Sequence, residues 1–261
     1  MSSLCVVILT KNEEKNIGAT IDNARLVTEE VLLVDSGSTD RTLAIAKEKG
    51  ARVAFRAWDD DFAAQRNFAL TQTTADWVLY LDADEHLNPE LAEAVRRALQ
   101  GTVPGGEDRQ YVFRRKTVAF GRTYNHGAMA PDDVPRLFPR ESVHWVHKVH
   151  ERPVCELPSV VLPGYVEHYT YDSWHSWAEK ANRYTSIWAE DQFARGKRVG
   201  GGTAVSHALA GFFKVLVLRA GFLDGWPGIY LCCCHGFYTL LKYMKLYECQ
   251  QNDEEKRRVR R

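Results

Sequence analysis

The stretch 76-DWVLYLDADEHLNPEL-91 runs an apolar segment directly into three acidic residues. The apolar part predicts a buried strand over residues 77–81. Asp82, Asp84 and Glu85 follow at its end. Removing an unpaired carboxylate from water costs several kcal/mol, so these side chains must either reach solvent or face a cation. Which of the two holds depends on the residues that the fold brings to this strand end.

Apolar runs and helical segments alternate through residues 4–99. The segment 10-TKNEEKNI-17 is expected to open a helix with Asn12 as its cap. Alternation of this kind predicts an α/β fold with a parallel sheet, in which ligands bind where the strands end. The expected strands cover residues 4–9, 31–34, 51–55 and 77–81, and the later helices cover residues 42–49, 61–70 and 89–99.

The pattern changes after residue 100. Residues 101–110 are typical of a surface loop, and two strand-like runs follow at 111–115 and 134–138. A histidine-dense segment occupies residues 144–153, and residues 174–195 are helical in pattern. No internal repeat is visible.

The composition narrows the functional class. Lysine plus arginine and aspartate plus glutamate both number 34, so the formal net charge is zero. This balance argues against nucleic-acid binding through bulk positive charge. The six cysteines lack the paired spacing of a metal site and no signal peptide is visible, which predicts reduced thiols in the cytoplasm. Cys5, inside the first strand, is expected to pack in the core.

The C-terminal part of the chain is apolar and basic. Two apolar runs lie within residues 203–248, but Lys214, Arg219 and Asp224 divide them, so neither is expected to span a bilayer. With aromatic and basic residues side by side and a basic tail at 256–261, the segment predicts an interfacial helical hairpin on a membrane surface. Packing of these helices against the catalytic domain, or against a second subunit of a homo-oligomer, stays open as the alternative.

Four motifs in order, 8-ILTKNEEKNI-17, 33-LVDSGSTDRT-42, 65-QRNFAL-70 and 77-WVLYLDADE-85, resemble those of the family-2 glycosyltransferases. The resemblance implies a nucleotide-sugar-binding α/β sheet of the GT-A type, which is Rossmann-like, over residues 1–172. Residues 173–261 would form a helical, membrane-apposed extension. Later segments are similar to the branch that includes lipopolysaccharide inner-core glucosyltransferases, which add glucose to a heptose. These segments are 136-RLFPR-140, 149-VHE-151, 221-GFLDGWPGIY-230 and 237-FYTLLKYMKLYE-248.

The resemblance also implies roles for the polar residues at the strand ends. Thr10, Asn12 and Glu13 would hold the nucleoside, and Asp35 would accept a hydrogen bond from the N3 imide of uracil. The rival interpretation of Asp35 is an Asx-turn cap for 35-DSGSTD-40, and both can hold at once.

Arg66 and Asp82 are also expected to bind the donor. Arg66 would reach the base or the diphosphate, and its rival interpretation is a solvated helix face. In the Asp-x-Asp motif, the turn points alternate side chains to one side. Asp82 is therefore expected to face the ribose, while Asp84 faces the metal.

Asp84 is expected to bind Mg²⁺ or Mn²⁺. Such a cation takes one or two protein carboxylates together with phosphate oxygens, and it neutralises the charge of a diphosphate leaving group. Some relatives add a histidine to the Asp-x-Asp motif. His168 is the first candidate for that second ligand and His147 is another, although a lone histidine is more often a packed or surface residue.

The catalytic base is expected at 150-HE-151. Many relatives carry an acidic pair at this point, and this sequence does not. Glu151 is the predicted base, with His150 as its orienter or substitute. If residues 144–151 were extended, Glu151 and His150 would point to opposite faces unless a turn intervened.

The strand-end residues and the resemblance together predict a metal-dependent glycosyltransferase at the cytoplasmic face of the membrane, and the resemblance implies that the transfer is inverting. Its donor would be a UDP-hexose, with glucose favoured, and its acceptor a lipid-linked saccharide. The rivals are a polyprenyl-phosphate glycosyltransferase and a nucleotide-sugar-binding protein without turnover. A nucleotidyltransferase fits less well, because residues 10–16 lack the glycines of a phosphate-binding loop.

Overall fold

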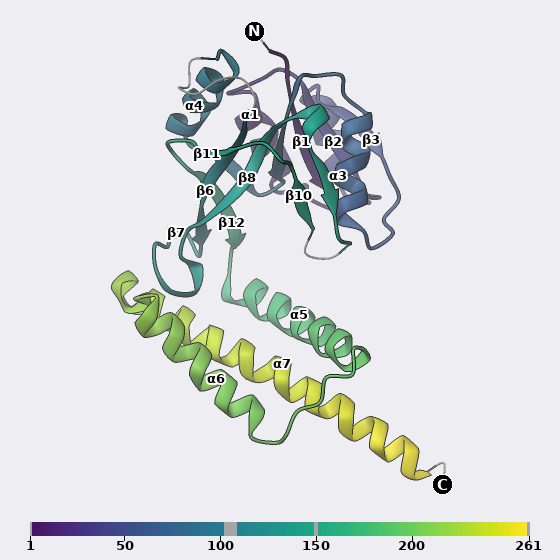
Figure 1. Ribbon diagram of the computed structural model, residues 1–261, viewed down its shortest axis with the longest axis vertical. Helices are drawn as coiled ribbons and strands as arrows, with labels where there is room; N and C mark the ends of the chain where they lie inside the picture. The colour runs from purple at the N-terminus through teal and green to yellow at the C-terminus, as the bar shows by residue number, and fades with distance from the viewer. Residues whose placement is uncertain (1, 102–108, 149–150, 260–261) are drawn as a thin grey trace. The chain divides into compact units, whose positions relative to one another are not determined.

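The computed structural model describes residues 2–101, 109–148 and 151–259, and the chain divides into two compact units (Figure 1). The first unit combines Met1–Lys116 with Asp132–Tyr169. The second combines Thr117–Pro131 with Thr170–Arg261, so it takes in a segment from the middle of the chain as well as the C-terminal helices.

A single large sheet forms the centre of the first unit. Its strand order is β3-β2-β1-β4-β8-β6-β12-β5, and the first four of these strands pair in parallel. This is the parallel sheet that the alternating pattern predicts. Antiparallel strands extend it beyond β4, which gives the mixed sheet of a GT-A-like fold. The strands are β1 (Leu4–Thr10), β2 (Val31–Asp35), β3 (Arg52–Phe55), β4 (Trp77–Asp82), β5 (Glu85–Leu87), β6 (Gln110–Ala119), β8 (Asp132–Pro139) and β12 (Val166–Tyr171).

Shorter elements complete the description, and two of them, β7 (Arg122–Thr123) and η1 (Gly127–Met129), lie in the segment Thr117–Pro131 of the second unit. β11 (Ser159–Val161) and β7 (Arg122–Thr123) pair with β6. β9 (His144–Val146) and β10 (Arg152–Val154) form a separate two-stranded sheet. The helices are α1 (Ile17–Ala24), α2 (Thr42–Glu48), α3 (Phe62–Thr71) and α4 (Pro89–Leu99), with 3₁₀ turns η1 (Gly127–Met129) and η2 (Arg140–Ser142).

The first helix begins later than the sequence predicts, and Asn12 is not its cap. Asn16 occupies the N-cap position of α1. Asn12 instead adopts a left-handed backbone with φ of 58°, and its Oδ1 accepts a hydrogen bond from the backbone N–H of Thr39 at 2.8 Å. Residues 11–16 therefore form a loop that contacts the loop after β2, and this contact competes successfully with helix formation.

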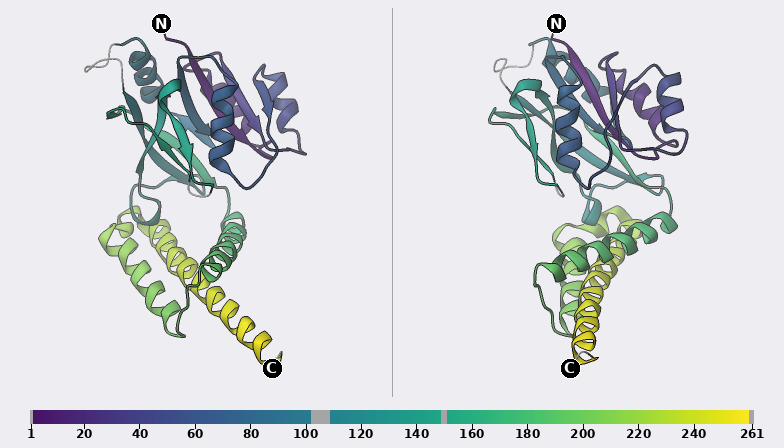
Figure 2. Two further views of the ribbon diagram at one scale, coloured as in Figure 1. Left: turned by 45° about the vertical axis from the view of Figure 1, so that its right-hand side comes forward. Right: turned by 90° about the vertical axis from the view of Figure 1, so that its right-hand side faces the viewer.

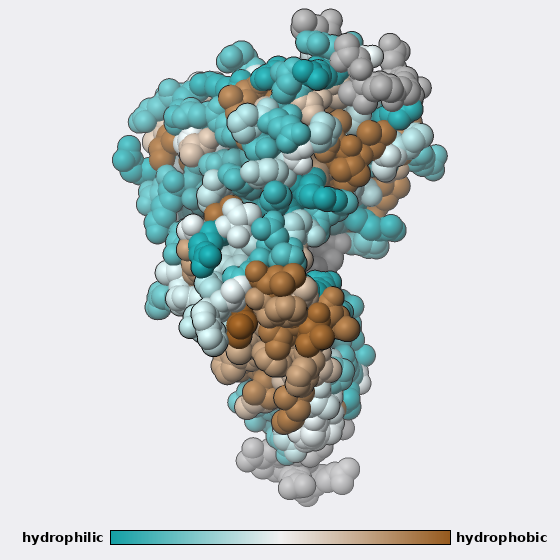
Figure 3. Space-filling view, turned by 90° about the vertical axis from the view of Figure 1, so that its left-hand side faces the viewer, coloured by the Kyte–Doolittle hydropathy of each residue, from teal (hydrophilic) through white to brown (hydrophobic). Residues whose placement is uncertain are grey.

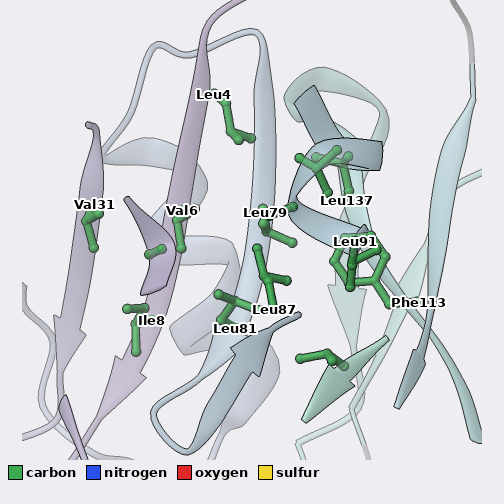
Figure 4. Packing of buried hydrophobic residues seen from close by; sticks show 14 of the residues in the cluster. Leu4, Val6, Ile8, Val31, Leu79, Leu81, Leu87, Leu91, Phe113 and Leu137 are labelled. Atoms are coloured by element: carbon green, nitrogen blue, oxygen red, sulfur yellow. The ribbon is translucent and has the colours of Figure 1, made fainter. Parts of the chain in front are cut away.

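Apolar side chains fill both faces of the parallel strands. Along β1, Val6 and Ile8 face the layer under α1 and α4, while Cys5 and Val7 face the layer under α3. Figure 4 shows the first of these layers. Burying each such aliphatic side chain contributes about 1.5–3 kcal/mol. Cys5 is a core residue as predicted, and burial raises the pKa of its thiol to about 12.

The second unit is mainly helical (Figure 2). Its elements are α5 (Trp174–Ala194), α6 (Thr203–Phe213), the π-helical turn η3 (Lys214–Leu218), the 3₁₀ turn η4 (Gly221–Asp224) and α7 (Gly225–Val259). Both α5 and α6 pack against α7. In the described chain, no helix alone has the length and apolar content to cross a membrane, but the pair Thr203–Leu218 and Gly221–Asp253, bent by 69°, has both together. The basic tail at 256–261 lies outside the residues whose side chains are described.

Candidate active site

The ends of three neighbouring strands meet at one edge of the sheet. The register places Thr10 opposite Asp35 and Leu9 opposite Asp82. Thr10 Oγ1 donates to Asp35 Oδ1 at 3.4 Å. Asp35 Oδ2 accepts from the backbone N–H groups of Gly37 and Ser38, at 2.8 and 3.0 Å. Asp35 is thus the Asx-turn residue of its loop, and it is almost fully buried.

Asn12 and Glu13 belong to the same edge. The backbone N–H of Asn12 donates to Ser38 Oγ at 2.9 Å, so Asn12 is held to the second loop by its backbone as well as its side chain. Glu13 Oε2 accepts from Asn16 Nδ2 at 3.0 Å. The structure therefore brings together the four residues that the sequence assigns to the nucleoside: Thr10, Asn12, Glu13 and Asp35.

Arg66, on α3, is a buried residue that joins two acids. Its Nη2 lies 3.0 Å from Asp82 Oδ1, and its Nε lies 3.3 Å from Glu151 Oε1. The guanidinium also lies over the Trp145 ring, 4.6 Å from its centroid. Only 6% of the Arg66 side chain is exposed. The rival interpretation as a solvated helix face is therefore wrong.

Arg136, on β8, supplies a cation to two of the three acids at the end of β4. Its Nη2 lies 3.0 Å from Asp82 Oδ2 and 2.5 Å from Glu85 Oε1. Arg115 adds a second cation 3.7 Å from Glu85 Oε1. Asp82 and Glu85 are thus neutralised by arginine side chains from α3, β6 and β8, and Asp82 accepts from two of them at once.

The pKa values of Asp82 and Glu85 shift in opposite directions. Burial opposes ionisation of Asp82, but the charges of Arg136 and Arg66 hold its pKa well below the usual range. Burial raises the pKa of Glu85, and the neighbouring charge of Asp82 raises it further against the effect of Arg136. One third of the Asp82 side chain, 34%, is exposed, so water screens its share of the attraction.

Asp84 and His168 form a second pair beside this cluster. Strand β12 pairs with β5 so that His168 stands opposite Glu85, and His168 Nε2 lies 3.4 Å from Asp84 Oδ2. The backbone N–H of Tyr169 donates to Asp84 O at 2.8 Å and fixes the turn. Burial lowers the pKa of His168, but its hydrogen bond to Asp84 and the charges of Asp84 and Glu85 raise it above the ordinary value.

The donor set of this pair fits a divalent cation. Two ligands at right angles around Mg²⁺ lie about 3 Å apart, which is close to the separation of the Asp84 and His168 atoms. Where the structure describes the chain, no three histidine, cysteine or acidic side chains gather as a ready metal site. A cation at Asp84 and His168 would therefore need further oxygen ligands from a bound diphosphate and water.

The segment 144–151 is not a continuous strand. It is extended only through Val146, because His147 turns the chain with φ of 69° before β10 pairs back on β9. A turn therefore follows Val146, which is the exception that the expected alternation of faces allowed. His147, the other metal candidate, lies exposed in this turn. His150 lies outside the described residues, and Glu151 is the member of the pair that reaches Arg66.

Sequence reasoning missed Arg136 and Arg115, and it gave Glu85 no role. A signal for Arg136 was present, because a lone arginine interrupts the otherwise apolar strand 134-VPRLF-138. Three acids after one strand require cations, and a charged residue inside a buried strand is where such a cation is expected.

Residues 5–133 match the family model described as Glycosyl transferase family 2. Over 260 residues, the chain is 28% identical to an uncharacterized glycosyltransferase of Rickettsia typhi, covering 95% of this chain and 88% of the relative. It is 29% identical over 203 residues to the lipopolysaccharide core biosynthesis glycosyltransferase LpsC of Rhizobium meliloti, covering 75% and 73%.

A solved structure of glucosyl-3-phosphoglycerate synthase from Mycobacterium tuberculosis, in complex with Mn²⁺, UDP and glucosyl-3-phosphoglycerate, is similar at a TM-score of 0.46. The identity is 18%, and the match covers 77% of this chain and 82% of that one.

Proposed function

We propose that this glycosyltransferase, whose residues 5–133 match the Glycosyl transferase family 2 model, transfers a hexose, with glucose favoured, from a UDP-sugar to a lipid-anchored saccharide with inversion. The observation that carries the proposal is the Asp84–His168 pair. Asp84 lies two residues after Asp82, the ion-paired residue that ends β4. This edge of a parallel sheet is where open α/β folds bind ligands.

Asp84 and His168 would hold Mg²⁺ or Mn²⁺. When bound, the cation neutralises the charge that develops on the UDP leaving group. Thr10, Asn12, Glu13 and Asp35 would bind the nucleoside at the neighbouring strand ends. Asp82 already accepts from two arginines, but each carboxylate oxygen has a second acceptor position that the ribose hydroxyls can use.

Glu151 is the proposed base. An inverting transfer requires a group that removes the proton from the acceptor hydroxyl as that oxygen attacks the anomeric carbon. Arg66 binds Glu151 at Oε1 and is itself fixed by Asp82 and the Trp145 ring, so it orients the carboxylate. Arg66 acts in this proposal as a positioning residue between the base and the strand end, in addition to the predicted contact with the donor.

The acceptor assignment rests on a relative and on the second unit. LpsC carries a name in lipopolysaccharide core biosynthesis, and the helical unit of this chain exposes apolar and basic side chains together. Both features support a saccharide acceptor anchored in lipid at the cytoplasmic face of the membrane. A polyprenyl phosphate is the second acceptor class to test, because an acceptor phosphate needs little help from a base.

Calorimetric titration of UDP with and without Mn²⁺ tests the donor site. We expect Mn²⁺ to strengthen UDP binding at least tenfold in the wild type and not in Asp84→Asn. His175→Asn is the control, because His175 is a largely exposed histidine on α5. Binding of UDP that is equal with and without Mn²⁺ in the wild type would remove the metal from the proposal.

Transfer assays with UDP-glucose test the base and the acceptor. We expect Glu151→Gln to lower kcat by about 10²–10⁴-fold with UDP affinity unchanged. Glu156→Gln, an exposed glutamate just after β10, is expected to retain activity. Transfer to polyprenyl phosphate but not to a lipid-anchored saccharide would favour the rival enzyme, and UDP binding without any transfer would favour the binding protein.

A further inference from the structure

An exposed apolar stripe runs along α6 and into η3. Val205, Leu209, Phe213 and Val217 recur every four residues, which places them on one face of the helix. Each is more than half exposed, at 54%, 54%, 56% and 56%. An amphipathic helix of a globular domain normally buries its apolar face. We therefore expect these exposed side chains to contact a partner outside the chain.

The bend after η3 is more exposed still. Leu218 is 82% exposed and Trp226 is 71% exposed, on either side of a bend where Ala220 adopts φ of 52°. Figure 3 shows a broad hydrophobic surface on the helical unit. We use the name apolar tip for the exposed apolar residues around this bend, which are Phe213, Val217, Leu218, Phe222, Leu223 and Trp226.

Positive charge accompanies the apolar tip. No acidic residue occurs between Asp191 and Asp224, whereas five basic residues do. Two of these, Lys214 and Arg219, are exposed within the tip itself. Asp224 is turned away from the surface, since only 10% of its side chain is exposed, its Oδ1 lies 2.9 Å from His126 Nδ1, and its Oδ2 accepts from two backbone N–H groups. The surroundings of the tip therefore complement a negatively charged surface.

We infer that the apolar tip inserts into the interfacial region of an anionic lipid membrane. The apolar side chains would enter the boundary between head groups and acyl chains, with Trp226 at that boundary. Lys214 and Arg219 would contact anionic head groups, where each basic residue adds to binding. The 69° bend fits a hairpin that dips into one leaflet. The inference deepens the proposed function by naming the surface that brings the enzyme to a lipid-anchored acceptor, and it rests on that function only for the acceptor.

Sedimentation with lipid vesicles tests the inference on the full-length protein. Vesicles of phosphatidylcholine alone are compared with vesicles that also contain phosphatidylglycerol. We expect the wild type to bind the anionic vesicles, and the double variant Val217→Asp/Leu218→Asp to bind at least about tenfold more weakly. Val161→Asp is the matched control, because Val161 on β11 is an equally exposed valine at 53%, and it is expected to bind like the wild type.

A second double variant, Lys214→Gln/Arg219→Gln, keeps every apolar side chain and removes only the charge. We expect it to lose most of the preference for anionic over neutral vesicles while its thermal unfolding is unchanged. This variant keeps the test decisive if the aspartate variant does not fold.

Three results would overturn the inference. The first is full vesicle binding by the aspartate variant, and the second is equal binding of wild type to neutral and anionic vesicles. The third is a wild-type dimer in solution that the aspartate variant converts to a monomer without vesicle binding by either, which would assign the tip to a second copy of the chain. UDP titration on the same samples distinguishes failure of this inference from failure of the proposed function. A protein that binds vesicles but not UDP would contradict the proposed function and leave the inference intact.

Discussion

At the scale of single residues, the site is an arrangement of paired charges. Arg136 serves two carboxylates with one nitrogen, Nη2, while Arg66 links Asp82 to Glu151. The Glu85 side chain is fully buried, so the arginine is needed to keep a charged carboxylate in the sheet. The alternative for an unpaired Glu85 is to take up a proton, which its raised pKa already favours.

Arg136→Met tests this dependence. Removing one partner of a buried pair leaves the other charge uncompensated, and we expect the free energy of unfolding to fall by about 3 kcal/mol. Urea unfolding followed by circular dichroism measures the change. Arg114→Met is the control, because Arg114 on β6 pairs with Asp133 where both side chains are largely exposed, and the expected loss is below about 1 kcal/mol. Equal losses of unfolding free energy in the two variants would show that burial does not make the Arg136 ion pairs more important for stability than an exposed pair.

The raised pKa of His168 predicts how metal binding depends on pH. A proton and a metal compete for the same imidazole, so the proton is displaced less easily when the pKa is raised. We expect the affinity for Mn²⁺ in the presence of UDP to rise steadily between about pH 6 and pH 8 as the imidazole loses its proton. Calorimetry at several pH values measures it. In His168→Gln the affinity should be weaker and the pH slope smaller, and an unchanged slope would exclude His168 as a ligand.

At the scale of elements, glycines permit the close packing of the helical unit. A Cβ on Gly228 of α7 would lie 2.3 Å from the backbone oxygen of Gly221, and a Cβ on Gly221 would lie 2.4 Å from Cys232 Sγ. These contacts join η4 to the first turns of α7. Close packing therefore explains Gly221 and Gly228, and a left-handed backbone with φ of 70° explains Gly225.

Gly228→Ala is expected to destabilise this part of the second unit by about 2 kcal/mol, because the new methyl group meets backbone that cannot move aside cheaply. Hydrogen exchange of the amides in η4 and α7 would localise the effect. The control is Gly201→Ala, where a Cβ meets nothing within 4 Å. Unchanged exchange in Gly228→Ala would contradict the close approach of Gly221 and Gly228.

At the scale of the whole molecule, the units do not follow the order of the chain. Thr117–Pro131 is grouped with the helices, and within that unit Ala119 and Tyr124 pack against Leu231. The expected division at residues 172 and 173 misses this segment. It was invisible in the sequence because the contact joins residues about a hundred positions apart.

Truncation tests the two-unit organisation. A chain cut after Tyr169, with residues 116–131 replaced by Asn-Gly, keeps the pairing of Arg115 with Asp132 and closes the hairpin with a tight turn. We expect this variant to fold and bind UDP. A chain cut after Asp172 that retains residues 117–131 exposes Ala119 and Tyr124, and we expect it to bind the dye ANS and to aggregate. The reverse result would assign residues 117–131 to the first unit.

Part of the site could be predicted because it is local in sequence. The strand over residues 77–81 and the acids after it follow from composition alone, and the parallel sheet places strand ends at one edge. The pairing of Asp84 with His168 was among the predicted combinations, and the structure brings the two together across β5 and β12. The predicted helix cap at Asn12 is wrong, because a contact with another loop outweighs the local capping preference.

The sequence by itself determined the parallel sheet, the helices that cover it and the presence of three acids at one strand end. These features depend on side-chain periodicity and on neighbouring residues, which act over a few positions. Only the tertiary structure decided which cations meet those acids. Arg66 and Arg136 reach Asp82 from 16 and 54 positions away, and Glu151 reaches Arg66 from 85 positions away. Such partners are chosen by strand register and helix packing, which no short segment of the chain contains.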